Sequence, residues 1–166
     1  DAALEQAGDI MDVLFARKAT FRQRRPGVVN LLSAAEMEAF LRNGLVGRLD
    51  LSGAERKKRR MLAIAEARHL ADMMADEPIG VQIGIVPDTL PHTGFQIFRQ
   101  PDRKMLTVSP FRLGAQPNVR VGVAMITSAP EALSLHEKTV EDMWRRALKG
   151  SAAGEFMRNL IAKHAS

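Results

Sequence analysis

The sequence predicts an α+β fold, in which a mainly antiparallel four-stranded sheet over about residues 79–127 is flanked by N-terminal and C-terminal helices. Two observations predict the sheet: apolar residues alternate along 79–86 and 119–125, and turn-forming residues separate the strand-like segments. A third is that helix-capping signals bound this block on both sides. With 166 residues, 46% of them hydrophobic, the chain is long enough to bury one compact core.

The first predicted strand has two unlike faces. Its large branched residues occupy alternate positions from Ile79 to Ile85, so they share a buried face. The other face carries Gly80, Gln82 and Gly84, and its small side chains allow a helix, a second backbone or a ligand to come close. The remaining predicted strands are Phe95–Arg99, Met105–Val108 and Val119–Met125.

Residues 2 to about 18 read as an amphipathic helix. Leu4, Ala7, Met11 and Leu14 follow one another at spacings of three and four residues and form a narrow seam. Such a seam suits packing on this domain or pairing with a second copy. Arg25, Pro26 and Gly27 then interrupt the helix. We therefore divide the chain into a connector or dimerisation helix, 1–26, and a single effector or sensor domain, 27–166, and expect a homodimer.

Three segments have the form of a capping box, in which a serine at the start of a helix is followed three residues later by glutamate. They begin at Ser33, Ser52 and Ser128 and predict helices to about residues 43, 75 and 149. A last helix is expected after Gly150, capped by Ser151 and carrying Phe156, Leu160 and Ile161.

The composition excludes several classes of protein. There is no cysteine, so disulfides, thiolate metal sites and cysteine nucleophiles are ruled out. No apolar run approaches the roughly 20 residues of a membrane-spanning helix, and the first residues do not resemble a signal peptide. We expect a soluble cytoplasmic protein with no membrane contact, cofactor or metal. The absence of an initiator methionine suggests a processed product or a piece of a longer chain.

The net charge of +5 and the pI of about 10.1 raise the alternative of direct nucleic-acid binding. Positive charge is concentrated in two stretches, Arg22–Arg25 and Arg56–Arg60. The second stretch consists of Arg56, Lys57, Lys58, Arg59 and Arg60. Because acidic residues are interleaved almost everywhere else, solvated helix faces are the main interpretation and nucleic-acid binding is the alternative.

Catalytic signatures are mostly absent. The chain has no HExxH pair, Walker loop, GxSxG elbow or dinucleotide-binding glycine motif. His136 and Lys138 form an HxK pair that is similar to the motif of the phospholipase D superfamily, but they fall on a predicted helix and would point about 200° apart. We expect no catalytic residue. An enzyme acting on a phosphate or carboxylate substrate is the second alternative.

The loops at the ends of the sheet are the candidate ligand site, because binding residues concentrate on loops held by a rigid scaffold. If neighbouring strands are antiparallel, the loops 87–94 and 112–118 emerge at the same end. The side chains that would converge there are His92, Arg112, Asn118 and Arg120. Arginine suits a carboxylate or phosphate because its planar fork donates two parallel hydrogen bonds. The competing interpretation is that these arginines are solvated or bond loop carbonyls.

The order of the elements resembles a known family. The relevant pieces are a helical region from Gly27, the long basic-to-alanine helix, the strand 81–86 with its proline-rich loop, the Ser-Pro-Phe-Arg sequence at 109–112 and two closing helices. They are similar to the C-terminal effector regions of bacterial helix-turn-helix regulators of the Xre/Cro type. The resemblance implies a non-enzymatic domain that senses a small-molecule effector or mediates dimers. No helix-turn-helix precedes Gly27, so DNA would be read by a domain absent from this chain.

Overall fold

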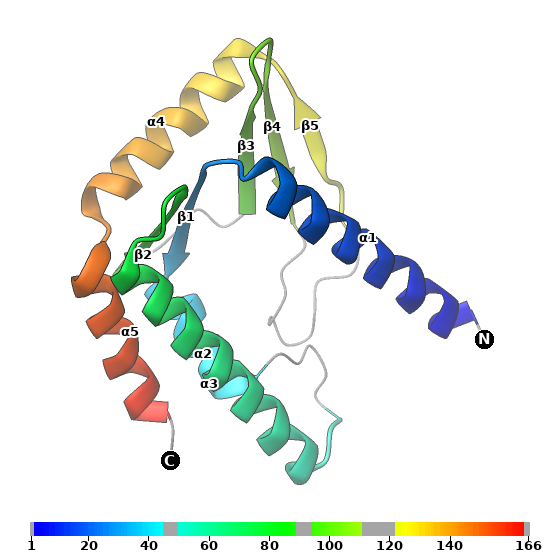
Figure 1. The fold of residues 1–166 in the computed structure, drawn as a ribbon, viewed down its shortest axis with the longest axis vertical. Helices are drawn as coiled ribbons and strands as arrows, with labels where there is room; N and C mark the ends of the chain where they lie inside the picture. Colours follow the sequence, from blue (N-terminus) through cyan, green and yellow to red (C-terminus); the bar gives the residue numbers. More distant parts are fainter. Residues whose placement is uncertain (1, 45–49, 89–93, 111–121, 165–166) are drawn as a thin grey trace.

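In the computed structural model, described over residues 2–44, 50–88, 94–110 and 122–164, the chain is α+β with two small sheets (Figure 1). For residues 2–7, 9 and 10 the description covers the backbone alone. The elements in chain order are α1 (Ala2–Arg24), β1 (Val28–Ser33), α2 (Ala34–Asn43), α3 (Gly53–Asp76), β2 (Val81–Val86), β3 (Gly94–Arg99), β4 (Lys104–Ser109), β5 (Met125–Thr127), α4 (Pro130–Arg146) and α5 (Gly150–His164).

The first sheet consists of β1 and β2, which run parallel. Val28 is paired with Val81 at one end and Ser33 with Val86 at the other. A parallel pair needs a long crossover connection, and α2 and α3 supply it here. On its other edge, β2 forms one antiparallel bridge, in which the backbone groups of Ile85 and Leu148 exchange hydrogen bonds of 3.0 and 2.9 Å.

The second sheet is antiparallel and has the strand order β3-β4-β5. Phe95 is paired with Val108 across β3 and β4, and Val108 in turn with Met125 of β5. Side chains at these paired positions share one face of the sheet. The helix α4 contacts both β3 and β4 and also reaches β2, so it connects the two sheets.

The predicted four-stranded antiparallel sheet is therefore wrong. β2 pairs with β1, a segment that the sequence placed at the start of a helical region, and it has no ladder to β3 in the described residues. Ile79 and Gly80 precede the strand, with Ile79 fully exposed and Gly80 at a φ of +85°. Of the predicted strand 119–125, residues 119–121 lie outside the described part and 122–124 are not a strand; β5 begins at Met125.

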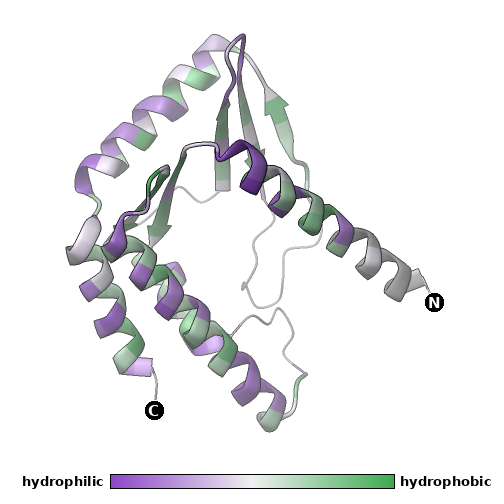
Figure 2. Cartoon of the chain, viewed as in Figure 1, coloured by the Kyte–Doolittle hydropathy of each residue, from purple (hydrophilic) through white to green (hydrophobic). Residues whose placement is uncertain are grey.

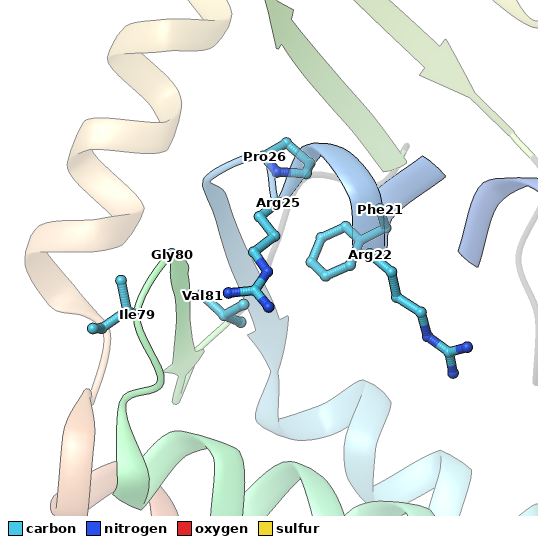
Figure 3. Close-up of a pocket in the computed structure, with 7 residues that line it drawn as sticks. All are labelled: Phe21, Arg22, Arg25, Pro26, Ile79, Gly80 and Val81. Atoms are coloured by element: carbon cyan, nitrogen blue, oxygen red, sulfur yellow. The ribbon is translucent and has the colours of Figure 1, made fainter. Parts of the chain in front are cut away.

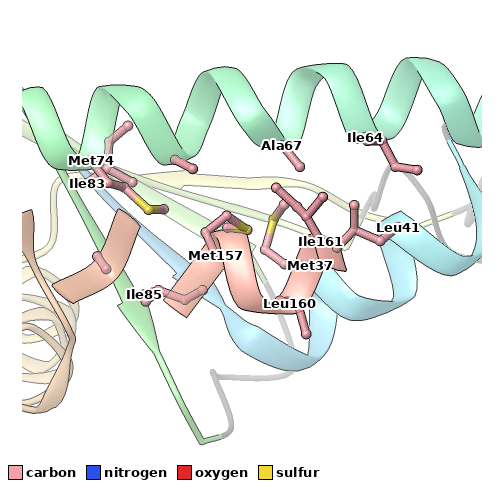
Figure 4. Packing of buried hydrophobic residues seen from close by; sticks show 12 residues of the cluster. Met37, Leu41, Ile64, Ala67, Met74, Ile83, Ile85, Met157, Leu160 and Ile161 are labelled. Carbon is pink, nitrogen blue, oxygen red and sulfur yellow. The ribbon is translucent and has the colours of Figure 1, made fainter. Parts of the chain in front are cut away.

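The main core lies between the β1–β2 sheet and the three helices α2, α3 and α5 (Figure 4). The three helices and β2 contribute apolar side chains that are almost fully buried, and Leu32 of β1 is partly buried against them. They include Met37 and Leu41 from α2, Ile64, Ala67, Ala71 and Met74 from α3, Ile83 and Ile85 from β2, and Ala153, Met157, Leu160 and Ile161 from α5. Burial of this cluster removes apolar surface from water and is the principal stabilising term of the fold.

A smaller core covers the opposite face of β2. Val86 packs there against Met143 of α4 and against Ala147, the residue that follows α4, with Phe95 at its edge. A side-chain carbon added to Gly84 would lie 3.0 Å from the Ala147 Cβ and 3.1 Å from the Trp144 Cζ3. The glycine-bearing face of the strand therefore meets a helix, and Gly84 is what allows that helix to approach.

Two of the three predicted helix caps are confirmed. The Ser33 Oγ accepts from the Glu36 N–H at 3.4 Å, and the Ser52 Oγ accepts from the Glu55 N–H at 3.2 Å. The box at Ser128 is wrong, because α4 begins at Pro130 with Ala129 as its N-cap and no side-chain cap bond. Likewise, α5 begins at Gly150 itself rather than after Ser151.

The helix α1 stands apart from both cores (Figure 1). It runs to Arg24, longer than the predicted end near residue 18, and stops before Pro26 as expected. Gly8 and residues 11–24, the residues of α1 whose burial is described, are all exposed. Figure 2 shows hydrophobic and hydrophilic residues following one another along the ribbon of this helix. The two cores of the α+β body thus contain none of the apolar side chains described for α1.

Candidate functional site

The most distinctive surface of the described chain is a stripe of large apolar side chains along α1. At 3.6 residues per turn, residues seven apart in sequence lie within about 20° of each other around a helix. The stripe consists of Met11, Leu14, Phe15 and Phe21, which are 47%, 42%, 60% and 41% exposed. Lys18 lies on the same side, between Leu14 and Phe21, and is also exposed. We call the four apolar residues, Met11, Leu14, Phe15 and Phe21, the α1 stripe.

The α1 stripe continues the predicted seam beyond its original limit. Met11 and Leu14 of the predicted dimer residues lie on it, whereas the side chains of Leu4 and Ala7 lie outside the described part. The sequence interpretation ended the helix near residue 18 and so missed Phe21. The signal that could have found Phe21 is the same seven-residue spacing, since Phe21 follows Leu14 by seven positions.

Where α1 joins β1, a shallow hollow of about 300 Å³ opens to solvent (Figure 3). Apolar side chains and two guanidinium groups line it, and in Figure 3 the Arg25 side chain lies beside Val81 while Arg22 points away. Its lining residues are Phe21, Arg22, Arg25, Pro26, Ile79, Gly80 and Val81. The hollow is at the small end of the range for ligand pockets. The exposed Arg25 guanidinium beside Val81 suits a small anionic group.

The second basic stretch lies in the first turns of α3. The Arg59 guanidinium pairs with Glu55 at 2.8 Å, and Arg60 donates from Nη2 to the backbone oxygen of His164 at 2.9 Å. Arg56, Lys57 and Lys58 are exposed and have no ion pair within the described residues. The predicted run of five available cations is therefore reduced to three.

The two basic stretches do not form one surface. The Arg22–Arg25 stretch borders Ile79 and Gly80, which follow the C-terminal end of α3. Arg56 lies at the other end of this 24-residue helix, whose length is about 36 Å. A duplex or anionic surface would have to span that distance to contact both stretches.

The predicted ligand site at the sheet ends lies outside the described residues. His92, Arg112, Asn118 and Arg120 all fall in 89–93 or 111–121. That prediction assumed that β2 and β3 are neighbouring antiparallel strands of one sheet, but the two strands belong to different sheets. The argument that the two loops emerge at one end of a single sheet is therefore removed.

His136 has a structural role in α4. Its Nδ1–H donates to the backbone oxygen of Ala132 at 2.8 Å, and its ring meets Phe95 edge-on, with the ring centroids 4.8 Å apart. The next residue, Glu137, accepts from Lys104 at 2.9 Å and from Arg99 at 3.0 Å. Hydrogen bonds from Lys104 and then Arg99 hold the pKa of Glu137 below its ordinary value. These contacts attach α4 to the antiparallel sheet.

Two other kinds of site are absent from the described residues. They contain no group of three or more histidine, aspartate or glutamate side chains placed to hold a metal ion. None of the helices in the described part combines the length and the apolar character needed to cross a membrane.

Comparison of the chain with protein-family models, curated proteins and solved structures finds no match. Among the described surfaces, the α1 stripe is the largest group of exposed apolar side chains on one element.

Proposed function

We propose that this chain is a non-enzymatic regulatory module that self-associates through α1 and forms the dimerisation and effector part of a bacterial transcriptional regulator. In this proposal, DNA is read by a domain outside the 166 residues. The observation that carries it is the contrast between a body with its own buried cores and a helix of 23 residues whose described side chains are all exposed.

Exposed apolar side chains are common singly, but a group of them on one helix is typical of an interaction surface. Met11, Leu14 and Phe21 are each more than 40% exposed and recur on one side of α1. Covering them would contribute about 25 cal/mol per Å² of apolar surface removed from water. An isolated helix gains most of its stability from packing such a face, so a partner for α1 would also stabilise α1 itself.

The regulatory part of the proposal rests on the resemblance of the chain's layout to the effector regions of Xre/Cro-type regulators. The same resemblance is the reason for expecting a small-molecule effector. The hollow beside Arg25 is a candidate place for such an effector, with a carboxylate or phosphate as the group that its guanidinium would recognise. Because Phe21 belongs to both the hollow and the α1 stripe, an effector bound there would touch the association surface.

Sedimentation velocity of two matched variants tests self-association through α1. Leu14→Lys introduces a charge into the α1 stripe, and we expect it to shift the protein to the monomer. Val13→Lys is the control, because Val13 is equally apolar and 52% exposed but lies about 100° away from Leu14 around the helix. Equal sedimentation of both variants and the unmodified chain, whether monomeric or dimeric, would contradict the proposal.

A second candidate function is direct nucleic-acid binding. The observation that favours it is the adjacent, exposed set Arg56, Lys57 and Lys58 at the start of α3, which has no ion pair with any residue of the described ranges. Contacts of such cations with phosphates release counterions, so the affinity would fall steeply with salt.

The test for this candidate is a titration of duplex DNA at several salt concentrations with the unmodified chain and with a variant carrying glutamine at 56, 57 and 58. Three phosphate contacts predict a slope of log K against log salt of about −2.7, and a slope near zero in the variant. An unchanged slope in the variant would exclude this surface, and absence of binding at low salt would exclude the function.

A further inference from the structure

We infer that the partner of the α1 stripe is α1 of a second copy of this chain, and that the two helices run antiparallel. This inference rests on the proposed self-association and adds the identity and direction of the partner. Three observations support it: the distribution of charge along α1, the position of Lys18 on the same side as the α1 stripe, and the position of α1 relative to the body.

Charge is separated along the length of α1. The acidic residues Glu5, Asp9 and Asp12 all precede residue 13, and the basic residues Arg17, Lys18, Arg22 and Arg24 all follow residue 16. Packed helices are 8–10 Å apart, which is close to the screening length at physiological ionic strength. An antiparallel pair therefore places the acidic half of each helix beside the basic half of the other, whereas a parallel pair places like charges together.

The position of Lys18 is a second argument for the antiparallel direction. It lies within about 40° of both Met11 and Leu14 around the helix, so it belongs to the apolar seam rather than to its border. In a parallel, in-register pair, Lys18 would meet its own copy inside the seam, and like charges there are unfavourable. In an antiparallel pair the two copies of Lys18 are separated along the axis, and each points toward the acidic half of its partner.

The helix macrodipoles and the position of the body favour the same arrangement. Antiparallel helices place the positive N-terminal end of each beside the negative C-terminal end of the other. The body is attached only at the C-terminal end of α1, and the N-terminal end lies away from it (Figure 1). Two antiparallel helices of 23 residues would keep the two bodies at opposite ends of a pair about 34 Å long.

Spin-label distances measure the direction directly, and the chain is suited to them because it contains no cysteine. Single cysteines at Val13, Ala16 and Gln23 place labels on exposed positions outside the α1 stripe. In an antiparallel pair, a label and its copy move apart along the axis by about 3 Å for each residue that separates the labelled position from the centre of the pair. We therefore expect three clearly different distances, whereas a parallel pair would give three nearly equal ones.

The outcomes separate this inference from the function on which it rests. Three different distances support antiparallel pairing. Equal short distances would overturn the direction but leave self-association intact, and the lack of any intermolecular distance would overturn both. The salt dependence of dimerisation supplies a second readout. Raising the salt concentration should weaken an antiparallel dimer several-fold, and a dimer that becomes stronger with salt would contradict the antiparallel arrangement.

Discussion

Gly154 of α5 lies directly against the backbone of Ala71 in α3. A side-chain carbon added at Gly154 would lie only 2.8 Å from the Ala71 carbonyl oxygen and 3.1 Å from the Ala75 Cβ. Neither the backbone oxygen nor a short alanine side chain can move aside as the end of a long side chain can. This contact sets how closely α5 approaches α3 and thus the depth of the main core.

We predict that Gly154→Val lowers the free energy of unfolding by about 2 kcal/mol or more, because overpacking a close helix contact forces the helices apart. Ala152→Val is the matched control, since Ala152 is exposed on the same helix and should lose only about 0.5 kcal/mol of helix propensity. Urea unfolding followed by circular dichroism measures both. Equal losses in the two variants would show that the α3–α5 contact is not tight.

A second prediction concerns the two arginines that end the basic run. Arg60→Gln removes the hydrogen bond to the His164 backbone, and we expect it to cost about 1 kcal/mol or more of unfolding free energy. Arg59→Gln removes only a partly exposed ion pair with Glu55 and should change stability by no more than about 0.5 kcal/mol. Urea midpoints compared at constant m-value provide the measurement. A larger loss at Arg59 than at Arg60 would contradict the assignment.

The third prediction is a pH dependence that originates at Glu137. Because hydrogen bonds from Lys104 and Arg99 lower its pKa in the folded protein below the ordinary value of 4.5, its ionised form stabilises the fold. That stabilisation is fully present at pH values above 4.5 and is lost as the pH falls through the lowered pKa.

The variant Glu137→Gln should therefore be less stable than the unmodified chain at neutral pH, and the difference should disappear in acid. Thermal unfolding at a series of pH values measures it. Glu141→Gln serves as the control, because Glu141 is exposed on the same helix and has no ion pair with a described residue. A stability difference for Glu137→Gln that is independent of pH would contradict this role.

The helices follow from local signals, and where a prediction failed a competing local signal explains why. The caps at Ser33 and Ser52 depend only on neighbouring residues, so the sequence contains all the information needed. At the third box, Pro130 disfavours the helical conformation for the residue before it, so Ala129 cannot be the first helical residue and becomes the N-cap. The restriction that Pro130 places on its neighbour therefore outweighs the serine-to-glutamate spacing in setting the start of α4.

The sheets were less predictable because strand pairing is not local. β3 and β4 are adjacent in the chain and were placed almost to the residue. β2 was recognised as a strand, but its partner β1 lies some 50 residues earlier and lacks a clean alternation. Both faces of β2 are covered by helices, and such a strand suits a parallel pair.

For the candidate site, the α1 stripe was predictable because spacing along one helix is a local property. The sequence contained the seam from Leu4 to Leu14, and the structure adds that its described part is exposed rather than covered by the body. That distinction depends on the tertiary arrangement. The convergence of loops around His92 and Arg112 was inferred from a single sheet, whereas β2 and β3 belong to different sheets, so this inference has lost its geometric support.

The molar mass of the unmodified chain in solution tests the central claim most directly. One copy has a mass of 18.3 kDa. Light scattering from a size-exclusion column at tens of micromolar protein should give twice that mass, falling toward one copy on dilution as the α1 pair dissociates. A mass of one copy throughout this concentration range would contradict self-association through the α1 stripe.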